Sequence, residues 1–209
     1  MLTKSIFVAT LIWAIYSYWI DSRPVIVDTD IPTIFPLSSL GELSINKQPV
    51  QKKINSKGKV FQYSEFKITP LAEFQLAAKV LSSKHYSRGL ESNLSPVDLA
   101  LGWGPMSKTD VIDKFSIKQS NRFYFWRTKN YPIPHDAVIS NSANMHFIPS
   151  NAMIDKKLKS VKAGQSVRFK GYLVRIDMDS GWRWISSLSR NDSGNGACEL
   201  ILVEEFSIL

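Results

Sequence analysis

The chain has 209 residues, of which 44% are hydrophobic, and its 26 Lys and Arg against 18 Asp and Glu give a formal net charge of +8. The single cysteine, Cys198, excludes an internal disulfide, so the fold must be held together by its apolar core. The basic residues are spread along the chain rather than confined to a tail.

The first twenty residues contain an uncharged apolar run from Ser5 to Ile20, preceded by Lys4. A helix over residues 2–20 would rise a little less than the ~30 Å of a bilayer's hydrocarbon core. The run ends in bulky aromatic residues, which suit an interfacial aromatic belt better than a signal peptidase site. We therefore predict a retained transmembrane anchor over residues 1–20, with cleavage of this segment as the alternative.

The charges that flank this run predict its orientation. The amino terminus and Lys4 precede it, whereas Asp21 and Arg23 cancel each other on the far side. The positive-inside rule then favours a cytoplasmic amino terminus. We predict a single-pass protein of the bacterial inner membrane that contacts the membrane through residues 2–20, with residues 21–209 in the periplasm.

Residues 21–59 contain several prolines with scattered Ser, Gly and Lys, a composition typical of a linker. A cluster of its lysines is a candidate contact for anionic lipid headgroups, at about 1 kcal/mol for each charge near the surface. The lysines concerned are Lys52, Lys53, Lys57 and Lys59. A solvated tether is the alternative, and the apolar stretch 25–36 is a candidate to pack on the domain.

Residues 60–209 are long enough for one compact domain with a sizeable core. Alternating apolar and polar residues predict a half-buried strand over residues 72–82. Further strands are predicted over residues 121–127, 165–176, 182–188 and 199–203. The apolar positions of 165–176 change phase at Gly171, which is typical of a β-bulge.

Short helices are predicted to begin at Ser95, Ser107 and Ser150, because each serine precedes a helix-start pattern. Together with the strands, these helices indicate an α+β domain. The bulged glycine and the short helices favour a strongly curved sheet of about five strands, an OB-like and partly open barrel.

Three segments resemble known families. Residues 161–174 resemble the G-x-x-V-x-x-x-G-x-L-V pattern of OB-like and SH3-like barrels. Residues 95–104 (SPVDLALGWG) and 142–149 (SANMHFIP) resemble segments of uncharacterised membrane-anchored bacterial proteins. The latter resemblance implies a location at the membrane and brings no activity, ligand or cofactor with it.

The sequence predicts neither a metal nor a cofactor. His85, His135 and His146 are not followed by a second histidine or a cysteine at the spacing of metal ligands. The glycines of residues 102–104 and 194–196 lack the lysine and the strand-to-helix context of a phosphate-binding loop.

One alternative reading is a membrane-anchored serine hydrolase or peptidase. Ser142, Met145 and Pro149 resemble in part the S-x-M-x-P box of membrane-anchored signal peptidases, although the methionine is one place late. That resemblance implies a nucleophilic Ser142, with Lys170 as the nearest candidate for a base. A Ser-His-Asp arrangement is a second form of this reading, with His135 or His146 and Asp98 or Asp136 as partners.

Two predicted strands interleave arginines with aromatic residues. The binding residues that we predict are Arg122, Tyr124, Trp126, Arg127, Trp182 and Arg183. Guanidinium groups beside ring faces suit sugars, anionic polymers and single-stranded nucleic acid. For an exported domain we predict a non-enzymatic module that binds a partner protein or an anionic or glycan ligand, and nucleic acid only if the topology is inverted.

Overall fold

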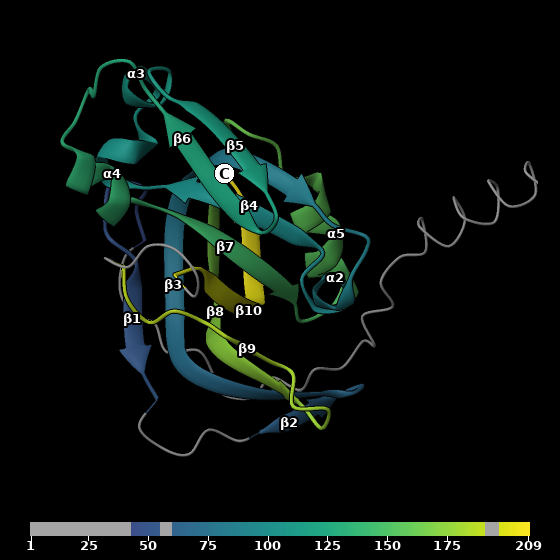
Figure 1. Ribbon diagram of the computed structural model, residues 1–209. Helices are drawn as coiled ribbons and strands as arrows, with labels where there is room; N and C mark the ends of the chain where they lie inside the picture. The colour runs from purple at the N-terminus through teal and green to yellow at the C-terminus, as the bar shows by residue number, and fades with distance from the viewer. Residues whose placement is uncertain (1–42, 55–59, 191–196) are drawn as a thin grey trace, which may run out of the picture.

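The computed structural model describes residues 43–54, 60–190 and 197–209, which form a strongly curved β-sheet flanked by short helices (Figure 1). The main sheet has eight strands. They are β1 (Val50–Lys53), β2 (Phe61–Tyr63), β3 (Phe66–His85), β4 (Val97–Gly102), β7 (Ser142–Pro149), β8 (Ser166–Met178), β9 (Arg183–Ile185) and β10 (Glu199–Ile208). A separate hairpin consists of β5 (Ser116–Ser120) and β6 (Phe123–Arg127).

The helices are short and lie in the connections between strands. They are α2 (Leu90–Leu94), the 3-10 helix η1 (Gly104–Ser107), α3 (Thr109–Ile112), α4 (His135–Ser140) and α5 (Ala152–Ser160). The longest, α5, begins at Asn151, whose side-chain oxygen accepts a hydrogen bond from the backbone N–H of Ile154 at 3.0 Å. This cap confirms the helix that the sequence predicts after Ser150.

Strand β3 closes the sheet because it is long and pairs with two different strands. Its residues 66–79 pair with β8, and its residues 79–85 pair with β4. Since β4 pairs with β7, β7 with β10 and β10 with β8, the hydrogen bonding returns to β3 and forms a ring of strands. The β7–β10 pair is parallel and the other pairs of the ring are antiparallel.

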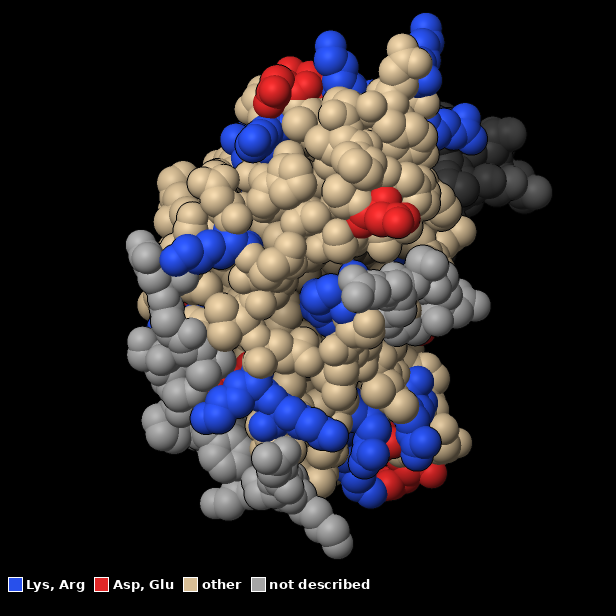
Figure 2. All heavy atoms as spheres, turned by 90° about the vertical axis from the view of Figure 1, so that its left-hand side faces the viewer, with Lys and Arg blue, Asp and Glu red and all other residues tan. Residues whose placement is uncertain are grey.

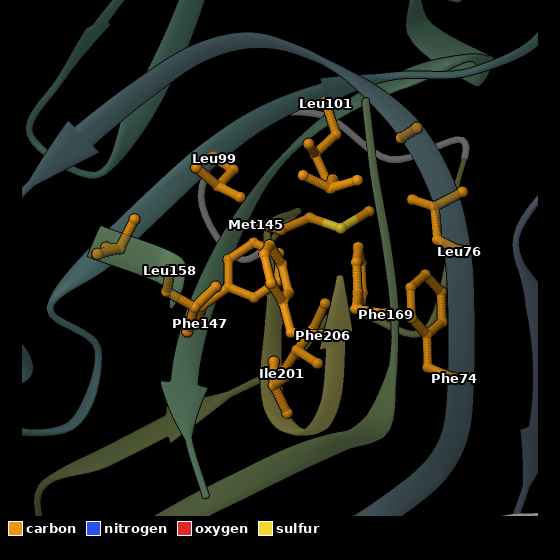
Figure 3. Close-up of a cluster of buried hydrophobic side chains, with 14 of the residues drawn as sticks. Phe74, Leu76, Leu99, Leu101, Met145, Phe147, Leu158, Phe169, Ile201 and Phe206 are labelled. Atoms are coloured by element: carbon orange, nitrogen blue, oxygen red, sulfur yellow. The ribbon is translucent and has the colours of Figure 1, made fainter. Parts of the chain in front are cut away.

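The interior of this ring holds the main apolar core (Figure 3). Phe74 and Leu76 of β3 face Phe169 of β8, and the rings of Phe74 and Phe169 stack at a centroid distance of 6.1 Å. The same cluster contains Leu99 and Leu101 of β4, Met145 and Phe147 of β7, Leu158 of α5 and Ile201 and Phe206 of β10. These side chains come from every strand of the ring, so their burial holds the ring closed.

The outer face of the ring carries two smaller apolar clusters. One contains Tyr172, Val174 and Ile176 of β8 with Leu200 and Leu202 of β10. From Gly171 onwards the outer face of β8 is buried as well as its inner face. This explains why the apolar positions in the sequence change phase at Gly171. The irregularities in strand pairing lie in the partner strands, between Val203 and Glu205 of β10 and between Pro70 and Ala72 of β3.

The other cluster fixes the β5–β6 hairpin to the outer face of β4. It contains Leu81, Ala100, Met106, Val111 and Val138, against which Tyr124 and Trp126 of the hairpin pack. The hairpin thus stands over β4 and β7 (Figure 1). Its attachment places the aromatic side chains of β6 beside the candidate site described below.

The fold class predicted from the sequence, an α+β protein with a transmembrane helix ahead of an OB-like, partly open barrel, is corrected here. The described residues are mostly β-sheet, and the longest helix among them has nine residues. The sheet has eight strands and is closed by the β3–β8 pairing. Within the described ranges no helix has the length and apolar character needed to cross a membrane, and the segment predicted to be an anchor, residues 1–20, lies outside them.

Several individual elements also differ from their predictions. The helix predicted to begin at Ser95 is strand β4, all six residues of which are buried. A strand that is buried on both faces has a continuous apolar run and is easily mistaken for a helix. By contrast, the strand predicted over 72–82 is confirmed as part of β3.

Part of the segment predicted to be a linker pairs with the domain. Strand β1 lies antiparallel to β3, with Val50 opposite Gln75. The Nε1 of Trp103 donates a hydrogen bond to Oε1 of Gln48 at 2.8 Å. Lys52 lies 3.9 Å from Glu73, while Lys57 and Lys59 lie outside the described residues. On the side of the molecule where β1 lies, basic side chains are more numerous than acidic ones (Figure 2).

Candidate functional site

A cleft of two adjoining hollows lies where the β5–β6 hairpin meets β7 and β9. One hollow, of about 420 Å³, is lined by His146, Arg122, Arg183 and the aromatic residues Phe123, Trp182 and Trp184; we call it the His146 hollow. The other, of about 350 Å³, is lined by Tyr124, Trp126, Ser142, Asn144, Arg190 and Glu199; we call it the Tyr124 hollow. Phe123 and Cys198 line both hollows. The two hollows are therefore adjacent and together form the candidate site.

A buried carboxylate organises the His146 hollow. Asp98 of β4 lies opposite His146 of β7 in the strand register, and neither side chain is more than 4% exposed. Oδ1 of Asp98 accepts a hydrogen bond from Nη1 of Arg122 at 2.8 Å and lies 3.0 Å from Nδ1 of His146. A carboxylate buried in this way is stabilised only by partners at such distances. Asp98 therefore fixes the position of Arg122, while the imidazole of His146 packs close beside it, its Nδ1 without a hydrogen-bond partner among the described residues.

Arg122 occupies a strained position at the tip of the β5–β6 hairpin. Asn121 and Arg122 form its two-residue turn, with φ values of 51° and 68°. Turns with positive φ at both central residues favour Asn and Gly, and a bulky residue there costs of order 1 kcal/mol. The side chain of Arg122 is held by Asp98, by the carbonyl of Ser95 at 2.9 Å and by the ring of Tyr86, 3.8 Å from its Cζ. Strain of this kind is typical of functional positions.

Tyr86 supports Arg122 as a neutral phenol. Its hydroxyl accepts a hydrogen bond from the backbone N–H of Arg122 at 3.1 Å. Burial raises the pKa of Tyr86, and the nearby Asp98 carboxylate adds to this effect, which outweighs the opposing hydrogen bond and charge of Arg122. The phenol therefore stays protonated at neutral pH and adds no negative charge to the hollow.

Two tryptophans line the His146 hollow. The ring of Trp184 lies 4.9 Å from the imidazole of His146, and the rings of Trp182 and Trp184 meet edge to face at 6.2 Å. Between them in sequence, Arg183 is exposed and its Nε donates to Oδ1 of Asp177 at 2.7 Å. The hollow thus combines ring faces with a partly buried arginine, Arg122, and an exposed one, Arg183.

The Tyr124 hollow contains the serine that the sequence offers as a nucleophile. Oγ of Ser142 donates to the carbonyl of Val138 at 2.6 Å, and the hydroxyl of Tyr124 lies 2.6 Å from the same oxygen. Because the serine proton is used by Val138, the tyrosine is the donor of the second bond. Burial raises the pKa of Tyr124 despite the hydrogen bond to Ser142, so the tyrosine stays neutral. Among the described residues no histidine, lysine or carboxylate is shown hydrogen-bonded to Ser142.

An ion pair lies at the end of the ring beside this hollow. Nη1 of Arg190 lies 2.6 Å from Oε1 of Glu199, whose side chain is 1% exposed. The guanidinium of Arg190 also lies over the ring of Phe74, with its Cζ 5.3 Å from the centroid. Loss of either partner would leave a buried charge, so this pair is expected to be a firm part of the wall.

The predicted binding residues fall into three places. Arg122, Trp182 and Arg183 line the His146 hollow, and Tyr124 and Trp126 line the Tyr124 hollow. Arg127 lies apart, in a third hollow with residues 113–116 and 128–130. Sequence reasoning did not include Asp98, His146 or Glu199 among the binding residues. The one available signal was a charged residue inside an apolar run, as in Val97-Asp98-Leu99.

Comparison with models of known protein families, with curated proteins and with solved structures found no match to this chain. In the ranges that the structure describes, no group of three or more His, Cys, Asp or Glu side chains is placed to hold a metal ion.

Proposed function

We propose that the domain is a binding module whose cleft takes an anionic carbohydrate. The observation that carries this proposal is the fixed guanidinium of Arg122 beside two tryptophans in the His146 hollow. Both hydrogen bonds of its side chain come from Nη1. Its Nη2 and Nε donors are therefore candidates to bind a carboxylate or sulfate, and 18% of its side chain is exposed.

The composition of the cleft supports a ligand in which the negative charge is carried by a sugar. Aromatic faces pack against the apolar faces of flat rings, while single polar groups fix the orientation of the ligand. Trp182 and Trp184 supply the faces at one end, and Asn144 and the Arg190–Glu199 pair supply polar groups at the other. The net charge of +8 adds long-range attraction for an anion.

The environment of Ser142 gives little support to the alternative of a serine hydrolase. A serine becomes a nucleophile at neutral pH only beside a base. The two partners shown for Ser142 among the described residues are a backbone carbonyl and a neutral tyrosine. Its hydroxyl is therefore better explained as part of the attachment of the hairpin to β7.

We also propose that the domain acts outside the cytoplasm, in the bacterial envelope. This proposal rests on the apolar residues 5–20 and the charges on either side of them, which lie outside the described residues. Carboxy-terminal fusions to alkaline phosphatase and to a fluorescent protein that folds only in the cytoplasm would test it. Phosphatase activity is expected. Cytoplasmic fluorescence would contradict the proposal and make nucleic acid the leading ligand.

Calorimetric titration with an oligogalacturonate and with the neutral oligosaccharide of the same length tests the ligand class. We expect the acidic sugar to bind at least about tenfold more tightly, which corresponds to about 1.4 kcal/mol. Added salt should weaken this binding. Equal affinities for the two sugars, or no binding of either, would contradict the proposal.

Two exposed arginines provide a matched pair of variants for this titration. Arg183→Ala removes a cation at the His146 hollow, whereas Arg127→Ala removes a cation from the separate third hollow. We expect Arg183→Ala to weaken binding of the acidic sugar about tenfold and Arg127→Ala to change it by less than about twofold. An equal loss in both variants would indicate non-specific attraction by the basic surface.

A further inference from the structure

We infer that the outer face of the β5–β6 hairpin is a docking surface for an anionic membrane. The cleft has no part in this contact. The choice of a membrane rests on the location proposed above, in the bacterial envelope. The surface, which we call the hairpin face, consists of Phe125 and the side chains of Lys114, Lys118, Arg127 and Lys129.

The two faces of the hairpin have different surroundings. Tyr124 and Trp126 of β6 point toward the domain, where they pack on the cluster at β4 and line the Tyr124 hollow. Phe125 and Arg127 alternate with them along the strand and therefore point the other way. Both are exposed, and 55% of Phe125 is accessible to solvent. The outer face of the hairpin is thus open to a partner.

Cations surround the exposed ring of Phe125. Lys118 of β5 lies directly opposite Phe125 in the strand register, so the two side chains are neighbours on one face. Arg127 lies two residues further along β6. It lines a hollow of about 690 Å³ together with Lys114 and Lys129. The ring therefore lies at one end of a continuous basic surface.

The four cations of the hairpin face are available to an external anion. In the described part of the chain, no ion pair or hydrogen bond is shown for any of their side chains. The carboxylates in the same stretch of sequence are Asp110 and Asp113, so a net positive charge remains. The hairpin face is therefore complementary to a negatively charged surface.

An exposed aromatic ring among cations suits a membrane interface. Aromatic side chains favour the boundary between headgroups and acyl chains, and nearby Lys and Arg attract anionic lipids. Four cations bind only weakly by themselves, so the hairpin face is expected to act together with an anchor that keeps the domain near the bilayer.

The length of the chain permits this contact. The predicted anchor ends at residue 20 and the described residues begin at Leu43, which leaves 22 residues between them. A chain of this length spans at most about 75 Å. That reach exceeds the diameter of a domain of this size, so any face of the domain can turn to the bilayer.

Fluorescent labels on the full chain test the inference. Because Cys198 is the one cysteine, a Cys198→Ser background accepts a single label at a chosen position. Ser116→Cys places it on the exposed side of β5, and Ala152→Cys places it on α5, which packs on the main core. Each labelled chain is reconstituted into vesicles with a quencher attached to the lipid acyl chains.

The vesicles contain either phosphatidylcholine alone or phosphatidylcholine mixed with phosphatidylglycerol. We expect phosphatidylglycerol to increase quenching of the hairpin label at least about twofold and to leave quenching of the α5 label unchanged. No increase at the hairpin, or an equal increase at both labels, would overturn the inference. This comparison needs no change to the residues of the hairpin face.

Two matched double variants assign the contact to particular side chains. Lys118→Glu with Phe125→Ser reverses a charge and removes an exposed apolar side chain on the hairpin face. Lys156→Glu with Met153→Ser makes the same kind of change on α5, where Met153 is 68% exposed. We expect the first pair to abolish the extra quenching at residue 116 and the second to preserve it. Equal losses would show that only net charge matters and would overturn the assignment to the hairpin face.

Single-stranded nucleic acid is the rival partner for a surface of cations and an aromatic ring. An oligodeoxythymidylate is therefore added to the chain labelled at residue 116 in phosphatidylcholine vesicles. A response of this label to the oligonucleotide but not to phosphatidylglycerol would overturn the inference in favour of nucleic acid. The assay contains no carbohydrate and gives the same result for a domain on either side of the bilayer. Failure of this inference is therefore distinguishable from failure of the proposed ligand or location.

Discussion

Oδ1 of Asp98 lies 2.8 Å from Nη1 of Arg122 and 3.0 Å from Nδ1 of His146, so one carboxylate oxygen contacts basic side chains from two different elements. Arg122 belongs to the hairpin tip and His146 to β7. The carboxylate therefore links the hairpin to the closed ring of strands. The side chain of Asp98 therefore lies between the two walls of the cleft.

Asp98→Ala should destabilise the domain by about 2–4 kcal/mol, because it leaves the partly buried guanidinium of Arg122 without its carboxylate. Urea denaturation gives the free energy of unfolding. Asp179→Ala is the matched control, since Asp179 pairs with Lys67 on the surface and its side chain is 85% exposed. That change should cost less than about 1 kcal/mol. Similar losses in the two variants would contradict the structural role given to Asp98.

Gly171→Ala should prevent tight closure of the ring. A Cβ at this position would lie 2.0 Å from the carbonyl oxygen of Leu202, and the contact is with backbone that has no freedom to rotate away. We expect a loss of more than about 3 kcal/mol in the free energy of unfolding. Gly164→Ala separates this effect from backbone strain, because Gly164 has a φ of +87° and open space around it. Its cost should be about 1 kcal/mol. An equal cost at both positions would be inconsistent with a steric clash at Gly171.

Asp177 should make the stability of the domain depend on pH in acid. Burial acts to raise the pKa of Asp177, but hydrogen bonds and charges from Arg183 and Arg175 outweigh it and lower the pKa below its usual value. The lowered pKa means that Asp177 stabilises the fold above about pH 4 and that this contribution is lost as the pH falls through the folded pKa. We expect Asp177→Asn to lose less stability than the native protein between about pH 5 and pH 2. Parallel curves from urea denaturation would contradict this.

Tyr124 and Ser142 should be energetically coupled. Each of the changes Tyr124→Phe and Ser142→Ala leaves a buried polar group with one partner fewer, at about 1–2 kcal/mol. The double variant should cost less than the sum of the two by at least about 0.5 kcal/mol, since both groups are then absent. A complete double-mutant cycle in urea measures this difference. Strict additivity would show that the 2.6 Å contact adds nothing to stability.

The alternating pattern of residues 72–82 identified strand β3, whereas Val97–Gly102 was mistaken for a helix. The apolar positions Phe74, Leu76, Ala78 and Val80 alternate because they meet the main core, and this pattern identified the strand although Gln75 and Ala77 are buried as well. Val97–Gly102 carries no alternation because the main core lies on one side of β4 and the hairpin cluster on the other. The closure of the ring could not be predicted from the sequence either, because the β3–β8 pairing joins residues about a hundred positions apart.

The candidate site was predictable only in part, for a related reason. The pattern of arginines beside aromatic residues identified Arg122, Trp182 and Arg183 as site residues, because this pattern lies within short segments of the sequence. The contacts between Asp98, Arg122 and His146 join three elements, and no local pattern predicts such a meeting. Cys198 looked isolated in the sequence, while in the fold it lies where the hollows meet.

The closure of the ring by β3 and β8 has a consequence for the synthesis of the chain. Phe66 pairs with Met178, and β10 must lie between β7 and β8 before the ring is complete. When β3, β4, β7 and β8 have left the ribosome, the gap between β7 and β8 stays open until β10 has emerged. Until then the nascent domain exposes part of its future interior to water, which makes it a natural client for chaperones.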